Sequence, residues 1–353
     1  MGKEIAYSTI PEQIEKLKSQ GLIISNEEFA INCLRCFGYS NLIKSYREPY
    51  MIITPDGEKK YRTGVTFEQI ASLHELDKSI RNAVMAAMQD LEEHIKEISA
   101  DVIAASFGTN QNDYIKFKNY KNKHKRIENY QLGNILDKLR ETSQTSKNPI
   151  HHYQSTYGTV PPWILFKSLY FGTIVNFIDL FKSNEQTEVM KRFLRFEELD
   201  ITEEAARLLM MNILFISMEY RNNAAHGGRM YNFSPNNSLK ASEIFKDGRS
   251  DYHPKFTHFI HLLELLKYQE PHVHLHDVLD EEVNRHCTLF PQDVTYLGQI
   301  LKIDITPCNM VFVCANSIKY HLYPNCSGIK DPIPIELSEA TENGFIPCKR
   351  CVK

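Results

Sequence analysis

One short segment, residues 219–229, combines side chains suited to cleaving a phosphodiester bond. It contains Arg221, Asn222 and His226, with the small Ala225 among them. At about 100° per residue, these side chains share an arc of roughly 140° on one helix face. An imidazole exchanges protons near neutral pH, and a guanidinium can hold a phosphate while its charge develops. The face is therefore suited to RNA cleavage in which no metal takes part.

The same segment also fits a simpler role at a helix end. His226 and Asn223 could merely cap the helix, where a cationic ring suits the dipole. Two observations favour the chemical interpretation. Arg221 is the only arginine of the chain that is followed by a histidine after four to six intervening residues. The pair also lies at a helix end late in a helical region rather than in a loop.

A lysine-rich segment, residues 116–126, has the composition of a surface for single-stranded RNA. It carries six Lys or Arg and no acid in eleven residues, with aromatic residues between them. Cations can follow the phosphates while aromatic rings stack on unpaired bases. From composition alone, a solvated connecting segment is an equal alternative. The residues predicted to contact RNA are Lys116, Lys118, Tyr120, Lys121, Lys123, Lys125 and Arg126.

The C-terminal residues contain a candidate metal-binding set. The predicted ligands are His321, Cys326, Cys348 and Cys351. A CxxC turn supplies two thiolates, and a His and a Cys from a hairpin complete a Cys3His set for structural zinc. Cys314 is the alternative fourth ligand, and free thiols are the alternative to metal. Residues 310–353 resemble a small zinc-binding β-module appended to bacterial nucleases and DNA-repair proteins. A module of this size buries too little apolar surface to fold without further stabilisation, such as a metal ion.

The elements that position these residues are predicted to be mostly helices, from about residue 9 to residue 285. Between Thr66 and Phe107, apolar residues recur at three- and four-residue steps without an internal proline, which predicts one long amphipathic helix. The arginine–histidine face belongs to a helix predicted from Thr202 through Ala225 and ended by glycine. Further helices are predicted at Pro11 with Thr9 as its cap, at Asn26 to Phe37, at Pro161 to Phe181 and at His253 to Gln269.

Short β-prone runs occur in two places. The run 51–54 with residues 59–61 predicts a small hairpin on the helical body, and the runs 310–315 and 318–322 predict another in the tail. The predicted fold class is thus all-α with a small β-rich zinc-binding module. The predicted domains are a helical domain over residues 1–285, a linker over 286–307 and the module over 308–353.

Composition places the chain among soluble globular proteins. Its 353 residues carry a net charge of −3, so any nucleic-acid surface must be local. No stretch approaches the roughly 20 apolar residues that cross a bilayer, and the N-terminus lacks the apolar core of a secretion signal. We therefore expect a cytoplasmic protein with no membrane partner. The eight cysteines are unevenly spaced, which indicates packing or metal binding rather than disulfides.

Several blocks accompany the arginine–histidine segment and its continuation, residues 228–232. They are Leu34–Tyr39, Phe67–Arg81, Leu91–Glu92, His152–Tyr157, Pro161–Trp163 and Tyr170–Gly172. Together these blocks resemble the Abi-like (abortive infection) proteins, a bacterial branch of the HEPN superfamily. The resemblance covers residues 9–235. Cys36 and Phe37 depart from the family's usual residues in ways that alter packing rather than chemistry.

The resemblance implies a helical bundle that forms a homodimer, with an arginine–histidine pair from each subunit lining a shared cleft. It implies a metal-independent endoribonuclease in phage defence or toxin-like growth arrest, with Arg221 and His226 as the catalytic pair and Asn222 as a polar assistant. RNA would be the substrate, and zinc would be structural only. The alternatives are a non-catalytic RNA-binding or antitoxin-like protein that holds a structured non-coding RNA, and a protein-interaction adaptor.

Overall fold

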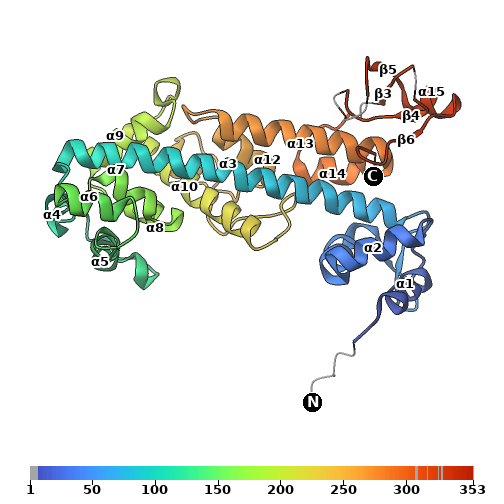
Figure 1. Cartoon of the computed structure of the whole chain (residues 1–353), viewed down its shortest axis with the longest axis horizontal. Helices are drawn as coiled ribbons and strands as arrows, with labels where there is room; N and C mark the ends of the chain where they lie inside the picture. Colours follow the sequence, from blue (N-terminus) through green and yellow to red (C-terminus); the bar gives the residue numbers. More distant parts are fainter. Residues whose placement is uncertain (1–6, 307–308, 316, 325, 327–328, 353) are drawn as a thin grey trace. The chain divides into compact units, whose positions relative to one another are not determined.

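The computed structural model describes residues 7–306, 309–315, 317–324, 326 and 329–352. This part of the chain is mostly helical, with short strands near its C-terminus (Figure 1), which confirms the predicted fold class. It folds as two compact units, one from residues 1–80 and 278–353 and one from residues 81–277. Among the described helices, none is long and apolar enough to cross a membrane.

The long predicted helix is present as α3 (Phe67–Phe107). Its apolar stripe is buried along its length, including Ile70, Leu73, Val84 and Leu91 at 0% exposure. Burial of a continuous stripe explains why a helix of 41 residues persists without an internal break.

The first unit begins with two capped helices. In α1 (Ile10–Ser19), Thr9 and Glu12 form a reciprocal capping box, and Asn26 caps α2 (Glu27–Phe37) by accepting a hydrogen bond from the Phe29 N–H. The helical turns η1 (Ser40–Lys44) and η2 (Glu48–Tyr50) lead to β1 (Met51–Ile53). This strand pairs antiparallel with β2 (Lys59–Tyr61), so the predicted hairpin is confirmed.

The segment predicted as a linker, residues 286–307, is helical over most of its described length. It holds the end of α13 (Glu270–Leu289), η7 (Pro291–Asp293) and α14 (Val294–Leu301). Its Cys287, Leu297 and Leu301 are fully buried, so the segment contributes to the core of the first unit rather than simply connecting two domains.

A buried polar network joins this segment to α3 and η2. His286 lies between the Ser72 hydroxyl (Nδ1–Oγ 3.0 Å) and the Asp293 carboxylate (Nε2–Oδ2 2.9 Å). The same carboxylate accepts hydrogen bonds from the Tyr50 hydroxyl at 2.7 Å and the Gln69 amide at 2.8 Å. All five side chains are at least 96% buried, so each depends on the others for its hydrogen bonds.

This network predicts that acid destabilises the first unit. Burial lowers the pKa of His286, despite the hydrogen bond to Asp293. Burial alone would raise the pKa of Asp293, but hydrogen bonds from His286, Gln69 and Tyr50 bring it below its ordinary value. The unfolded chain therefore binds protons more readily at both residues. Stability should fall below about pH 6.5, where the unfolded histidine protonates, and further below about pH 4.

The measurement is the melting temperature of the full chain between about pH 7.5 and pH 5.5. His286→Gln should flatten the dependence on pH. His261→Gln is the matched control, because His261 is 61% exposed on α12 (Phe256–Leu263), and it should leave the dependence unchanged. Equal pH dependence in His286→Gln and the wild type would exclude the network as its source.

The second unit is built around α10 (Glu203–Ala225), which begins at the predicted cap Thr202. Helices α8, α9, α11 and α12 all contact α10. The helices of this unit besides α3, α10, α12 and the start of α13 are α4 (Gln111–Tyr114), α5 (Leu132–Ser143), α6 (Ile150–Tyr157), α7 (Pro162–Leu165), α8 (Phe171–Ile178), α9 (Ser183–Phe193) and α11 (Ala241–Ile244). Their short 3₁₀ turns are η3 (Phe117–Asn119), η4 (Glu128–Tyr130), η5 (Phe166–Ser168) and η6 (Phe196–Glu198).

Two predicted helices of this unit differ from the structure. The single helix expected from Pro161 to Phe181 is broken, because Leu169 and Tyr170 adopt extended backbone between η5 and α8. The break directs Leu169 into the core at 3% exposure and Tyr170 to solvent at 76%. The helix expected from His253 to Gln269 is shorter and corresponds to α12.

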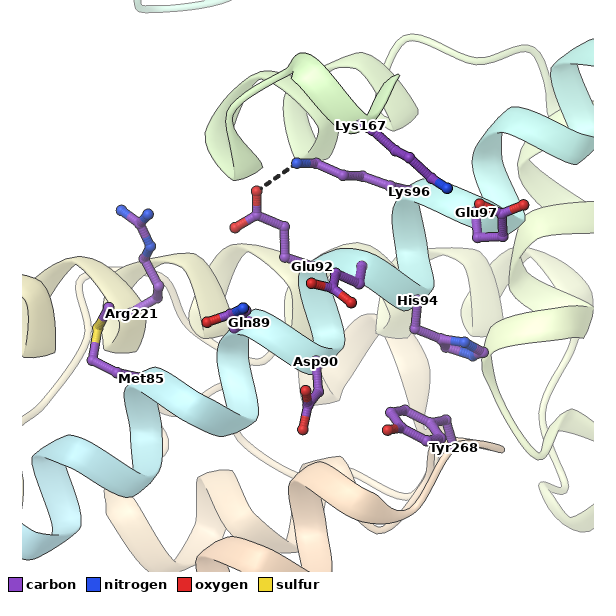
Figure 2. A pocket seen from close by; sticks show the side chains of 11 residues that line it. Met85, Gln89, Asp90, Glu92, His94, Lys96, Glu97, Lys167, Arg221 and Tyr268 are labelled. Atoms are coloured by element: carbon purple, nitrogen blue, oxygen red, sulfur yellow. Dashed lines mark hydrogen bonds and ion pairs between the residues drawn. The ribbon is translucent and has the colours of Figure 1, made fainter. Parts of the chain in front are cut away.

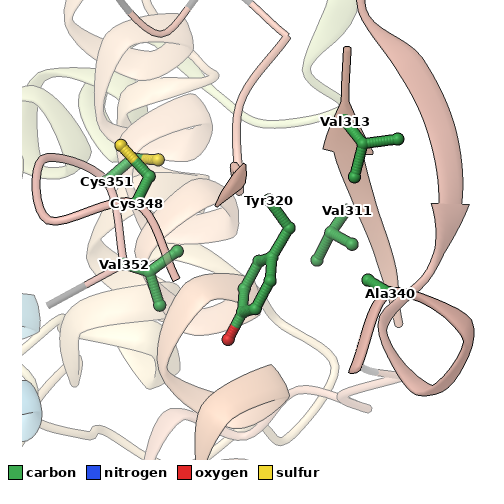
Figure 3. Packing of buried hydrophobic residues seen from close by; sticks show 7 residues of the cluster. All are labelled: Val311, Val313, Tyr320, Ala340, Cys348, Cys351 and Val352. Atoms are coloured by element: carbon green, nitrogen blue, oxygen red, sulfur yellow. The ribbon is translucent and has the colours of Figure 1, made fainter. Parts of the chain in front are cut away.

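The described part of the C-terminal module contains four short strands and one helix: β3 (Met310–Val313), β4 (Lys319–Tyr320), β5 (Ile333–Glu336), α15 (Leu337–Glu342) and β6 (Ile346–Pro347). β3 pairs antiparallel with β5, and β4 pairs parallel with β6. The predicted hairpin between 310–315 and 318–322 is reduced to one bridge, Phe312 to His321, because later strands take most of the backbone partners. Figure 3 shows Val311, Val313, Tyr320 and Ala340 in the small core.

Candidate functional site

The last turn of α10 ends in a tightly folded loop. Gly227 adopts a φ of +72°, which ends the helix as the sequence predicted. Asn223 then holds the returning chain, since its side-chain amide donates to the Arg229 carbonyl at 2.8 Å. A Cβ on Gly228 would lie 2.0 Å from the Asn223 amide oxygen, so this approach requires glycine. Asn223 thus holds the loop that follows the helix, whereas the C-cap position is occupied by His226, whose backbone N–H donates to the Asn222 and Ala224 carbonyls.

The buried side of this turn is held by aromatic packing. Tyr220 stacks on Phe259 with 4.1 Å between ring centroids and 5° between planes, and its hydroxyl donates to the Pro254 carbonyl at 2.9 Å. Ala224 is also buried, at 5% exposure. Because these residues face the core, the residues next to them in the sequence face away from it.

The outward side of the turn carries the three predicted residues. Asn222 and His226 are exposed, and Arg221 is partly exposed. The Arg221 guanidinium donates to the Asn222 amide oxygen at 3.4 Å, and the His226 backbone N–H donates to the Asn222 carbonyl at 3.1 Å. The structure thus places a guanidinium, an amide and an imidazole on one accessible arc of a well-anchored helix end.

Arg221 also lines a groove of about 870 Å³ between α10 and α3. Figure 2 shows the Arg221 side chain near Met85 and Gln89, while Lys167 reaches toward Glu97. The other lining residues are Asp90, Glu92, Glu93, His94, Lys96 and Tyr268. His226 is not among the residues that line this groove.

The groove is mixed in charge but acidic on balance. It has four carboxylates, Asp90, Glu92, Glu93 and Glu97, against the three cations Lys96, Lys167 and Arg221. Lys96 is already paired with Glu92 at 2.7 Å, with both side chains largely buried. A phosphate would therefore meet repulsion along most of the groove and attraction mainly from Arg221 and Lys167.

The predicted metal ligands of the C-terminal module converge on one point. The donor atoms of His321, Cys326, Cys348 and Cys351 all lie within 4.8 Å of one another. The Cys326 and Cys348 sulfurs are 3.9 Å apart, and the Cys351 sulfur is 3.7 Å from His321 Nδ1. A tetrahedral zinc ion with Zn–S bonds of about 2.3 Å requires separations near these values. The Cys3His donor set therefore fits structural zinc.

Two of the cysteine ligands have pKa values that are shifted in opposite directions. Burial raises the pKa of the Cys351 thiol to about 12. Burial opposes ionisation of Cys348 too, but the Arg350 and Cys351 backbone N–H groups and the neighbouring thiols lower its pKa. A bound divalent cation would keep the cysteines as thiolates. Because the four protein ligands complete a tetrahedron, the ion would stabilise the module rather than bind substrate.

A family comparison matches residues 32–232 to the model described as Abi-like protein. The chain belongs to the Abi-like protein family. The matched region is more than half of the chain and includes the arginine–histidine segment, whereas the C-terminal module of this Abi-like protein lies outside it. Neither the curated proteins nor the solved structures contain a significant match.

The lysine-rich segment of this Abi-like protein is more integrated into the fold than its composition indicates. The Tyr120 ring is 4% exposed among Phe107, Phe177 and Phe181, which is incompatible with the predicted stacking on bases. Its hydroxyl donates to the Tyr114 carbonyl at 2.6 Å, so its polar atom is also engaged.

Three of the predicted lysines have carboxylate partners. Lys123 and Lys125 both pair with the Asp179 carboxylate, and Lys116 pairs with Asp113 at 2.7 Å. Lys121 is partly buried, and this burial lowers its pKa. The exposed members are Lys116, Lys118, Lys123 and Arg126. The segment thus offers a smaller cationic surface than six independent charges would.

Sequence reasoning did not identify the α3 residues beside the arginine–histidine face. Met85, Gln89 and the groove carboxylates come from a helix more than 120 positions earlier in the sequence. The sequence pattern identified only the apolar stripe of this helix, to which these residues do not belong. Lys167 was likewise missed, because its helical turn became apparent only when the predicted helix proved to be broken.

Proposed function

We propose that this Abi-like protein is a HEPN-type, metal-independent endoribonuclease that acts in phage defence by abortive infection or as a toxin-like RNase. The main observation in support of this proposal is the accessible arc of Arg221, Asn222 and His226 at the end of α10. This arc lies inside the region that matches the family. Family membership supports the defence role, and the arc supports the chemistry.

The side chains suit cleavage by the RNA's own 2′-hydroxyl. One imidazole accepts the 2′-hydroxyl proton as that oxygen bonds to phosphorus and the bond to the 5′-oxygen breaks. A second imidazole returns a proton to the departing 5′-oxygen. Arg221 stabilises the charge on the phosphate, and Asn222 orients the guanidinium. The products are a 2′,3′-cyclic phosphate and a 5′-hydroxyl.

A homodimer follows from this chemistry, because each chain supplies one such histidine. RNA is the proposed substrate, with further contacts from the exposed members of the lysine-rich segment, Lys116, Lys118, Lys123 and Arg126. Zinc is proposed only as a structural ion of the C-terminal module, held by the four converging ligands.

The second candidate is a non-catalytic protein that holds a structured RNA. The exposed Lys116, Lys118, Lys123 and Arg126 favour it in one respect, since cations on the surface can hold RNA phosphates whether or not the strand is cleaved. Both candidates predict RNA binding, and only the first predicts strand cleavage.

The proposed function predicts that the purified full chain cleaves unstructured RNA without added divalent cations. Brief treatment with EDTA should leave the rate unchanged, and the products should carry 2′,3′-cyclic phosphate ends. Zinc content is measured in the same samples, so that loss of the structural ion is not mistaken for loss of a catalytic one. RNA binding without cleavage, or EDTA-sensitive cleavage at unchanged zinc content, would contradict the proposal.

A further inference from the structure

A stripe of residues on α3 lies beside the arginine–histidine arc of α10. Arg81, Met85 and Gln89 are spaced four residues apart, so they lie on one face of the helix. Met85 and Gln89 line the groove together with Arg221. The Arg81 guanidinium donates to the Gly227 carbonyl at 3.4 Å.

These contacts fix the direction of the stripe relative to the last turn of α10. Its Gln89 end lies near Arg221, and its Arg81 end lies at the residue directly after His226. α3 and α10 are thus antiparallel here, and the stripe runs alongside the arc of Arg221, Asn222 and His226. Arg81 of α3 consequently lies at one end of the arc and Arg221 of α10 at the other.

We propose that Arg81 is a phosphate-binding and positioning residue of this site, and that RNA crosses the arc between Arg81 and Arg221. The inference rests on the proposed function, since it assigns the path of the RNA at the same site. An arginine has five N–H donors in a rigid fork, so it can hold a carbonyl and a phosphate oxygen together. By holding the Gly227 carbonyl, Arg81 also positions the backbone that carries His226.

The charges around the arc support this path. Toward the far end of the groove, Glu93 and Glu97 add negative charge, while Lys96 is paired with Glu92 and Lys167 reaches toward Glu97. A polyanion is repelled in that direction. At the near end, Arg81 is partly exposed beside the exposed His226. The backbone of the RNA therefore passes over the end of α10 rather than along the groove.

The test compares Arg81→Gln with Arg81→Lys in the full chain, with a fluorescent unpaired RNA oligonucleotide as the probe. Binding is measured in a His226→Ala background, so that it does not depend on cleavage. We expect Arg81→Gln to weaken binding about tenfold, and to reduce the slope of log affinity against log salt by about 0.7. Arg81→Lys should restore the salt slope, since it restores the charge, but only part of the affinity, since it lacks the fork.

Arg140→Gln is the matched control. Arg140 lies on α5 in the same unit, is exposed, and like Arg81 donates to a backbone carbonyl, that of Ile115 at 3.3 Å. It should leave affinity and salt slope unchanged. Thermal unfolding of each variant accompanies the binding data, and the salt slope is the deciding quantity because a purely structural defect would not change it.

The outcomes separate this inference from the proposed function. Unchanged affinity and salt slope in Arg81→Gln would overturn the role of Arg81, even if the wild type cleaves RNA. Absence of cleavage in the wild type would overturn the proposed function, while an Arg81-dependent salt slope would still support the RNA path. In an active wild type, Arg81→Gln on its own should raise KM about tenfold.

Discussion

Replacing His226 with alanine should lower RNA cleavage by about 10²–10⁴-fold, because it removes the imidazole proposed as the general acid or base. RNA affinity should change little, since Arg221 remains. The fold should also be retained, because His226 is exposed and forms the C-cap through its backbone. Cleavage of a labelled RNA and growth of cells that express the variant are the two measurements.

His261→Ala is the control for this experiment. Like His226, His261 lies near the C-terminal end of a helix of the same unit and is exposed. Its loss should leave cleavage and toxicity at the wild-type level. If His226→Ala still cleaves RNA as the control does, the catalytic assignment fails. If His226→Ala and the wild type both bind RNA and neither cleaves it, the non-catalytic alternative is supported.

Replacing Cys348 with serine should unfold the C-terminal module. In small metal-stabilised domains, the binding free energy of zinc, about 10–16 kcal/mol, is also the folding free energy. Few of the described residues of the module are buried, and three of them, His321, Cys348 and Cys351, belong to the proposed ligand set. Loss of one ligand should therefore expose Val311, Tyr320 and their neighbours together.

Two measurements check the zinc prediction. Elemental analysis of the wild type should give about one zinc per chain, and Cys348→Ser should give close to none. Limited proteolysis should then cut Cys348→Ser within residues 309–352, where the wild type resists. Cys314→Ser is the matched control, because Cys314 lies in the same module but outside the converging four. Wild-type protease resistance in a zinc-free Cys348→Ser protein would contradict the prediction.

Many local features could be predicted from the sequence. The capping box of Thr9, the Asn26 cap, the 41-residue α3 and the Gly227 end of α10 depend on residues within a few positions of one another. Their energies are short-range, so the pattern of residue types specifies them directly. The convergence of His321, Cys326, Cys348 and Cys351 was predictable for a related reason, because two pairs at fixed short spacing leave few other arrangements for a small module.

The tertiary structure decided what depends on distant partners. The composition around Tyr120 predicts an exposed aromatic among lysines, yet its ring is buried by Phe107 of α3, Phe177 of α8 and Phe181, which follows α8. Strand β3 pairs along its length with β5 rather than with the β-prone run that follows it in the sequence. Backbone hydrogen-bonding groups are the same in nearly every residue, so the sequence does not specify which strand is the partner. The buried contacts of His286 with Ser72, and of Asp293 with Tyr50 and Gln69, are likewise invisible in their own segment.

In the candidate site, too, some features could be predicted from the sequence and others depend on tertiary contacts. The sequence alone determined which chemistry is available, because Arg221, Asn222 and His226 must share a face wherever that helix forms. Only the tertiary structure decided what faces them, namely the α3 stripe of Arg81, Met85 and Gln89 with the acidic groove beyond it. Helical periodicity is a property of one segment, whereas the electrostatic environment of a site depends on segments that only folding brings together.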